Sequence, residues 1–172
     1  MIMENPTFPG EKDGLLAYDG SLRLAPALQF DEFGDIDTVS DFNTGGLATI
    51  ESEGTYSFES AADVGAVRRL RLTTKLDATS FLVVSEIDKR VENIDTWEDW
   101  DGPLQGVGDA QVWYRQTDDD PDGANPAWSG WDRLDSAEAE ARGFEFEVRL
   151  TSTDPAYNIL VSTLEINIEE LS

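Results

Sequence analysis

A run of aspartates in the second half of the chain is spaced as in a calcium-binding loop. Asp118, Asp120 and Asp122 alternate ahead of Gly123, which matches the first half of the pattern D-x-D-x-D-G. Ca²⁺ takes roughly six to eight oxygen ligands, and alternate carboxylates in a tight loop can converge on one ion. The second half of the pattern fails, because Ser129 stands where a bidentate Glu should close the site. The three aspartates are therefore a candidate metal site supported by half a motif, and an acid-rich hairpin loop is the favoured alternative.

Two tryptophan pairs in polar segments form the second candidate site. Trp97 and Trp100 stand in D-T-W-E-D-W-D, and Trp128 and Trp131 stand in P-A-W-S-G-W. Rings of this kind beside carboxylates suit a sugar, since the ring can stack on a pyranose while the acids accept hydroxyl protons. The competing interpretation is that the rings cap the ends of a sandwich or fill a subunit interface. We favour that interpretation and keep the four tryptophans as candidate glycan- or partner-binding residues.

The composition argues against an enzyme. The chain has no His and no Cys, which removes the Ser-His-Asp triad, the thiol nucleophile and the Cys-type zinc site. The acids of residues 95–101 could form a glycosidase pair, but 36 Asp and Glu residues offer many such pairs by chance. We expect no catalytic residues, and no cofactor unless the aspartate loop binds Ca²⁺.

The charge narrows the choice of partners. A net charge of −24 over 172 residues is repelled by phosphate backbones and by anionic membrane surfaces, so neither nucleic acid nor membrane insertion is expected. A composition that is 40% hydrophobic and includes 17 aromatics can still fill a core, unlike an acidic disordered chain. The cluster Arg68, Arg69, Arg71 and Lys75 falls largely on the wet side of an alternating segment. Pairing of these bases with acids across the sheet is the favoured explanation, and a partner surface is the alternative.

Alternation of apolar and polar residues predicts an all-β protein. Leu15–Leu24 is expected to be a hairpin with Asp19-Gly20 at its turn. Ser136–Arg142 has helical propensity but is short, so at most a single turn, or extended chain, is expected. The last strand is expected to place one set of apolar residues on a single side: Leu160, Leu164, Ile166 and Ile168. The other segments that favour strands are 47–50, 55–59, 67–78, 81–87, 110–115 and 144–151.

This spacing of short strands predicts an antiparallel β-sandwich of jelly-roll or carbohydrate-binding-module type, with a barrel as the second choice. Residues 1–12 contain Pro6, Pro9 and Gly10 and lack periodicity, so they are expected to be an N-terminal arm that docks on a neighbour. Residues 13–172 are then expected to form a single domain.

The C-terminal half resembles a known kind of module. The run G-D-A-Q-V-W-Y-R-Q-T-D-D-D-P, the W-x-x-W loop, R-G-F-E-F and L-T-S-T-D-P-A-Y-N-I-L-V-S together cover about residues 108–165. As an ensemble they are similar to a β-rich module of tail-tip proteins from long-tailed bacteriophages and gene transfer agents, of the host-specificity (J-like), central-fibre or tail-fibre type. The module usually lies within a much longer chain.

The resemblance implies a structural, non-enzymatic part of the virion tail that is made in the host cytoplasm and takes part in host attachment. The implied partners are other tail-tip, hub or fibre proteins and a host-surface glycan. By analogy with threefold phage fibres, a homotrimer or attachment to a trimeric hub is expected. A free glycan-binding module, assisted by calcium or not, is the alternative.

Overall fold

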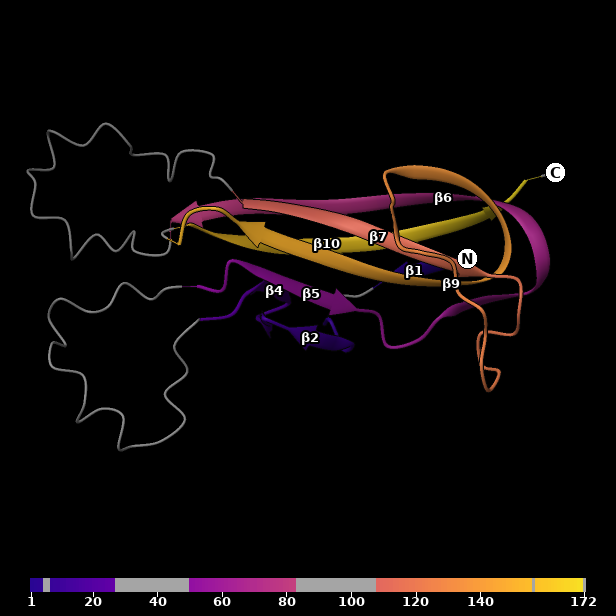
Figure 1. Ribbon diagram of the computed structural model, residues 1–172. Coiled ribbons are helices and arrows are strands. Elements are labelled where there is room, and N and C mark those ends of the chain that lie inside the picture. Colours follow the sequence, from indigo (N-terminus) through magenta and orange to yellow (C-terminus); the bar gives the residue numbers. More distant parts are fainter. Residues whose placement is uncertain (5–6, 27–49, 83–107, 156, 172) are drawn as a thin grey trace, which may run out of the picture.

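The computed structural model describes residues 1–4, 7–26, 50–82, 108–155 and 157–171, and within them it is all-β. All of the strand pairings in these ranges are antiparallel and belong to one sheet (Figure 1). No helix of the described ranges is long and apolar enough to cross a membrane. The strands are β1 (Ile2–Glu4), β2 (Glu11–Asp13), β3 (Leu15–Tyr18), β4 (Ser21–Leu24), β5 (Glu53–Ser57), β6 (Ala62–Leu82), β7 (Gly108–Thr117), β8 (Asp132–Arg133), β9 (Ser136–Ser152) and β10 (Tyr157–Glu170).

Strand β9 joins the parts of the sheet. Along one edge it pairs first with β6 and then with β5, and along the other edge its second half pairs with β7. Strand β6 extends beyond its pairing with β9, and β10 pairs with it along almost the whole length of β10 (Figure 1). Pro26 and Ile50 form an isolated bridge, and Glu51 N donates to Ala25 O at 2.9 Å. The end of β4 therefore meets the start of β5, and the sheet nearly closes into a barrel-like sandwich.

The interior is lined by the inward side of each strand. Phe8, Tyr56, Phe58 and Phe146 form a chain of ring contacts with centroids 5.5–5.9 Å apart. Aliphatic residues from β4, β6, β9 and β10 fill the rest of the core, and the most deeply buried are Leu22, Leu24, Leu72, Val148, Leu150, Val161 and Ile166. Burial of this apolar surface is the main term that stabilises the fold.

Several predicted elements are confirmed. The hairpin is β3 and β4, with Asp19 and Gly20 at positive φ (48° and 70°) as a tight primed turn requires. Residues 136–142 are extended, because the sequence A-E-A-E-A alternates with period two and buries Ala139 and Ala141. The segments expected at 67–78 and 81–87 run without a break from 67 to 82 inside β6, and 83–87 lie outside the described residues.

Two expectations differ from the structure. Residues 1–12 were expected as an arm, but their described strands belong to the sheet, since β1 pairs with β10, Glu11 and Lys12 of β2 pair with β5, and Phe8 is 1% exposed. Leu160 does not share the buried side with Leu164. A register shift between Val161 and Thr163 inserts one extra residue, so that Ile159 and Val161 become the buried residues before it.

Candidate functional site

The loop with the second tryptophan pair folds back along β7. Ser129 N donates to Gln116 O at 2.9 Å, and Gln116 N donates to Ser129 Oγ at 3.0 Å. Farther back in the loop, Ala127 N donates to the carboxylate of Asp119 at 2.8 Å. These bonds fix the W-S-G-W segment against the strand, so Trp128 and Trp131 are held on the outer face of β7.

Arg115 of β7 contacts both of these rings. Its guanidinium carbon is 5.2 Å from the Trp128 ring centroid and 4.8 Å from the Trp131 centroid, within the range of a cation–π contact with each ring. Arg115 Nε also donates to Glu145 Oε2 at 2.6 Å, from the residue opposite it on β9. The side chains of Arg115 and Glu145 are 31% and 33% exposed, so this aromatic and ionic stack is a partly buried surface feature.

A second stack of the same kind lies farther along these strands. The Arg149 guanidinium carbon is 4.0 Å from the Trp113 ring centroid, and Arg149 is ion-paired with Glu147. Glu147 is only 8% exposed although it lies on the outer side of β9. Trp113 Nε1 is buried and finds no hydrogen-bond partner among the described residues. The outer face of β7 and β9 therefore carries two layers of tryptophan and arginine.

A cavity of about 230 Å³ borders the Arg115 stack. It is lined by Trp131, Arg115 and Glu145 and by the end of β5 with the turn that leads to β6, residues 57–61. Glu59 in this turn is exposed and makes no hydrogen bond or ion pair within the described part of the chain. The cavity thus combines an aromatic ring, a fixed ion pair and a free carboxylate.

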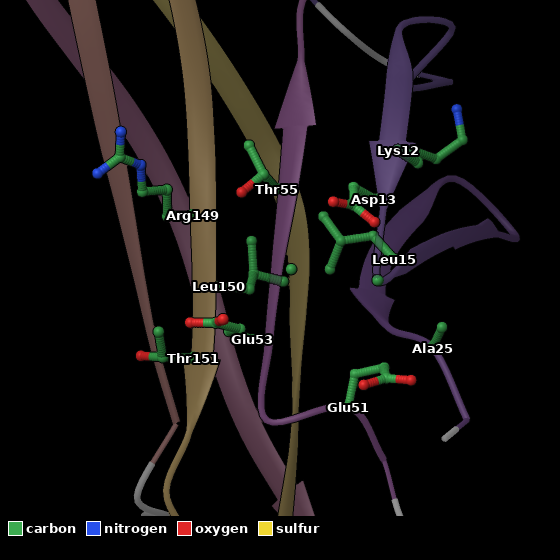
Figure 2. A pocket seen from close by; sticks show the side chains of 12 residues that line it. Lys12, Asp13, Leu15, Ala25, Glu51, Glu53, Thr55, Arg149, Leu150 and Thr151 are labelled. Carbon is green, nitrogen blue, oxygen red and sulfur yellow. The ribbon is translucent and has the colours of Figure 1, made fainter. Parts of the chain in front are cut away.

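A larger cavity of about 580 Å³ lies between β2, β3, β5 and β9 (Figure 2). Asp13, Glu51 and Glu53 line it and have no ion pair among the described residues. Lys12, also on its wall, donates to the backbone oxygens of Phe8 and Gly10 at 2.8 and 2.7 Å. Its charged lining is mixed, with three acids and the two bases Lys12 and Arg149, and nothing among the described residues identifies a ligand for it.

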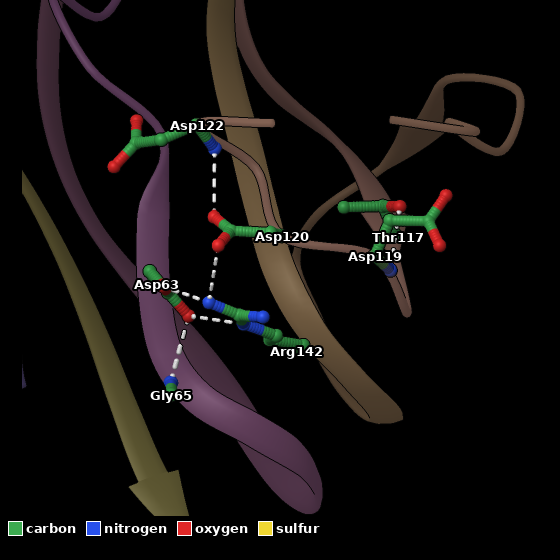
Figure 3. A network of polar contacts seen from close by, with 7 residues as sticks. All are labelled: Asp63, Gly65, Thr117, Asp119, Asp120, Asp122 and Arg142. Atoms are coloured by element: carbon green, nitrogen blue, oxygen red, sulfur yellow. Dashed lines mark hydrogen bonds and ion pairs between the residues drawn. The ribbon is translucent and has the colours of Figure 1, made fainter. Parts of the chain in front are cut away.

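An arginine of β9 contacts the aspartate loop (Figure 3). Asp120 is ion-paired with Arg142 at 2.9 Å and accepts a hydrogen bond from Asp122 N at 3.1 Å. Arg142 also donates twice to Asp63 of β6, at 3.1 and 3.0 Å. These hydrogen bonds, with one from Gly65 N, hold the pKa of Asp63 below its usual range. Among the described residues, which include Asp118, Asp120 and Asp122, no group of three acids is placed to bind a metal ion.

The basic cluster on β6 pairs with acids as the favoured interpretation predicted. Arg69 and Arg71 both reach Glu138 of β9, at 2.8 and 3.3 Å. Lys75 pairs with Glu165 at 3.4 Å, and Arg68 pairs with Glu170 at 2.7 Å. Glu138 has a lowered pKa, chiefly because both arginines donate hydrogen bonds to it. These bases neutralise neighbouring acids across the sheet.

Sequence reasoning found only part of this site. It marked Trp128 and Trp131, which the structure brings together around one cation, but it missed Arg115 and Glu145 between them. The available signal was that Trp113 and Arg115 alternate with inward residues on β7, as Glu145 and Arg149 do on β9. Trp97, Trp100 and the acids of residues 95–101 lie outside the described residues.

Comparison with known proteins adds no relative. No protein-family model, no curated protein and no solved structure matches this chain. Functional inference therefore depends on the residues and geometry of the chain itself.

Proposed function

We propose that this chain is a non-enzymatic structural and host-attachment component of a bacteriophage tail tip or tail fibre. The observation that carries the proposal is the stack of Trp128, Arg115 and Trp131, all of which come from the segment that resembles tail-tip modules. Within that segment β7 pairs with both β8 and β9. The resemblance thus falls on a contiguous unit of the sheet that displays aromatic side chains.

The geometry of this unit suits recognition of another surface. Aromatic residues and arginine dominate the energetics of protein interfaces when they are held in a fixed arrangement. Ion pairing to Glu145 and the hydrogen bonds of Ser129 hold the rings before any partner arrives. A preorganised surface loses less conformational entropy on binding than a flexible one. The proposed partners are hub or fibre proteins of the tail and a host-surface glycan, with a trimeric assembly by analogy with other phage fibres.

Mass spectrometry of purified particles from the phage or transfer agent that encodes this chain tests the proposal. We expect its peptides in intact, density-purified particles at a fixed ratio to the major tail protein. Particles that lack the chain altogether would remove the basis for a virion role.

A free glycan-binding module is the second candidate, favoured by the cavity beside Trp131 and by the carboxylate of Glu59, which is unpaired among the described residues. A glycan array probed with the purified chain, with and without a calcium chelator, separates the two. Specific glycan binding by a chain that is absent from particles would favour this candidate. No binding to any glycan would leave it without support.

A further inference from the structure

We propose that the cavity beside Trp131 is a subsite for one uncharged pyranose ring. The inference rests on the proposed attachment function and names the class of ligand that the outer face would recognise. It is carried by the residues that line the cavity, by the ion pair that Arg115 makes with Glu145, and by Glu59, which has no hydrogen bond or ion pair among the described residues.

The aromatic wall of the cavity is fixed in place. Trp131 borders the cavity and also stacks on Arg115, at 4.8 Å from ring centroid to guanidinium carbon. Phe58 and Phe146 add apolar surface below, with centroids 5.9 Å apart. Flat aromatic surface of this kind matches the apolar C–H face of a pyranose. A ring already held by its neighbours need not be ordered when the sugar binds.

The polar groups of the cavity are suited to hydroxyls. Ser57, Glu59 and Ser60 lie on the turn that faces Trp131. The Glu59 carboxylate is exposed and uncommitted within the described residues, and an ionised carboxylate only accepts hydrogen bonds. Sugar hydroxyls are donors, so one or two of them can pair with Glu59 while the serine hydroxyls adjust to donate or accept.

The charge of the cavity selects against acidic sugars. Its cation, Arg115, is already paired with Glu145, so the pair leaves no net positive charge for an incoming anion. Glu59 adds a negative charge, and the chain as a whole carries −24. A field of one sign repels ligands of the same sign. An uncharged sugar is therefore preferred over a uronic or sialic acid.

The size of the cavity limits the ligand to one ring. Pockets for drug-sized ligands hold roughly 300–1,000 Å³. This cavity, at about 230 Å³, is smaller and fits a single hexose, with further rings of a glycan left in solvent.

The test is a titration of the full chain followed by nuclear magnetic resonance. The indole N–H of Trp131 is assigned with Trp131→Phe and monitored as methyl glycosides of glucose, galactose, mannose and N-acetylglucosamine are added. Methyl glucuronide serves as the charged counterpart. We expect saturable shifts of this signal with at least one neutral glycoside and none with the glucuronide. Loss of one hydrogen bond in Glu59→Gln should raise the Kd about 2- to 10-fold.

Glu140→Gln is the matched control. Glu140 is exposed on β9 and does not line the cavity, so this substitution removes the same charge elsewhere on the surface. It should leave the Kd unchanged. The proposal is overturned if none of the four neutral glycosides shifts the Trp131 signal, if Glu59→Gln binds as well as the native chain, or if the glucuronide binds equally. None of these results bears on whether the chain is present in particles, and absence of the chain from particles would not change the titration. Failure of the sugar subsite and failure of the proposed function are therefore distinguishable.

Discussion

At the scale of residues, the outer face of β7 depends on how Arg115 is held. Two rings from the W-x-x-W loop and one carboxylate from β9 contact its guanidinium. A planar guanidinium can stack and donate hydrogen bonds in its own plane at the same time, which an ammonium group cannot do. Arginine is therefore the residue type that lets this cluster form.

Arg115→Gln should lower the free energy of unfolding by about 1–2 kcal/mol, because it removes a partly desolvated cation–π contact and an ion pair. Arg115→Lys should recover only part of the loss. Urea unfolding measures both changes. Arg133→Gln is the control, since among the described residues Arg133 pairs only with nearby Asp135, and its side chain is 52% exposed. Equal losses in Arg115→Gln and Arg133→Gln would contradict a stabilising role for the stack.

The carboxylate of Asp63 gives the fold a dependence on pH. Arg142 holds the pKa of Asp63 below its ordinary value of 3.8, so this contribution to stability is present above that value. It is lost as the pH falls through the lowered pKa of the folded state. The Tm difference between the native chain and Asp63→Asn should therefore be full near pH 6 and shrink below about pH 4.

Thermal unfolding between pH 2.5 and 7 checks this prediction. Asp122→Asn removes the same charge from a side chain that accepts no hydrogen bond among the described residues. The Tm difference between the native chain and Asp122→Asn should be smaller than that for Asp63→Asn and should vary little over that pH range. A native-to-Asp63→Asn difference that grows toward low pH would have the wrong sign for a lowered pKa.

At the scale of elements, β10 shows what alternation can and cannot predict. The apolar residues from Leu164 to Ile168 alternate and are buried as expected. The register shift after Val161 reverses the side on which earlier residues lie, and the sequence I-L-V-S-T of residues 159–163 gives no sign of it. A bulge is set by the partner strand, in this case β6, so it depends on tertiary pairing that alternation within one strand does not encode.

Because of the bulge, substitution of two neighbouring residues should lower the free energy of unfolding by unequal amounts. Ile159→Ala should lower the free energy of unfolding by about 2–5 kcal/mol, because Ile159 is 2% exposed in the core. Leu160→Ala should cost less than about 1 kcal/mol, since Leu160 lies outside the core and is partly exposed. Chemical denaturation of both variants provides the comparison. A greater loss of stability in Leu160→Ala than in Ile159→Ala would contradict the bulge and indicate that β10 alternates without interruption.

The N-terminal segment was harder to predict because its strands are only three residues long. Composition rich in Pro and Gly favoured an arm, yet one aromatic residue decides its position. Phe8 packs edge-to-face on Tyr56 at 5.6 Å, and Gly10 lies so close to Ser57 O that no Cβ would fit. Such contacts join residues almost 50 positions apart, which local patterns cannot specify.

Phe8→Ala should therefore cost about 3–5 kcal/mol of unfolding free energy, as expected for an aromatic residue in a core. Ile2→Ala is the control in the same segment, because Ile2 is 63% exposed, and it should change stability by less than about 0.5 kcal/mol. Both values come from urea unfolding. A loss in Phe8→Ala no larger than in Ile2→Ala would indicate that the segment is an arm after all.

At the scale of the whole molecule, the all-β class was predictable, because period-two patterns recur in most of the described strands. The chemistry of the outer face was predictable only in part. The W-x-x-W spacing marked the loop, but the register that places Arg115 opposite Glu145 is a property of the assembled sheet. Much of the excess acid is exposed, where it gives the barrel-like sandwich a charged surface that discourages association through its edge strands.

Immunogold electron microscopy of intact particles tests the proposed function most directly. Antibodies raised against the purified chain are applied to particles of the phage or transfer agent that encodes it. We predict gold at the distal end of the tail, and blocking of that label by added purified chain. Label confined to the capsid, or no label on particles that contain a complete tail, would contradict a role in tail-tip attachment.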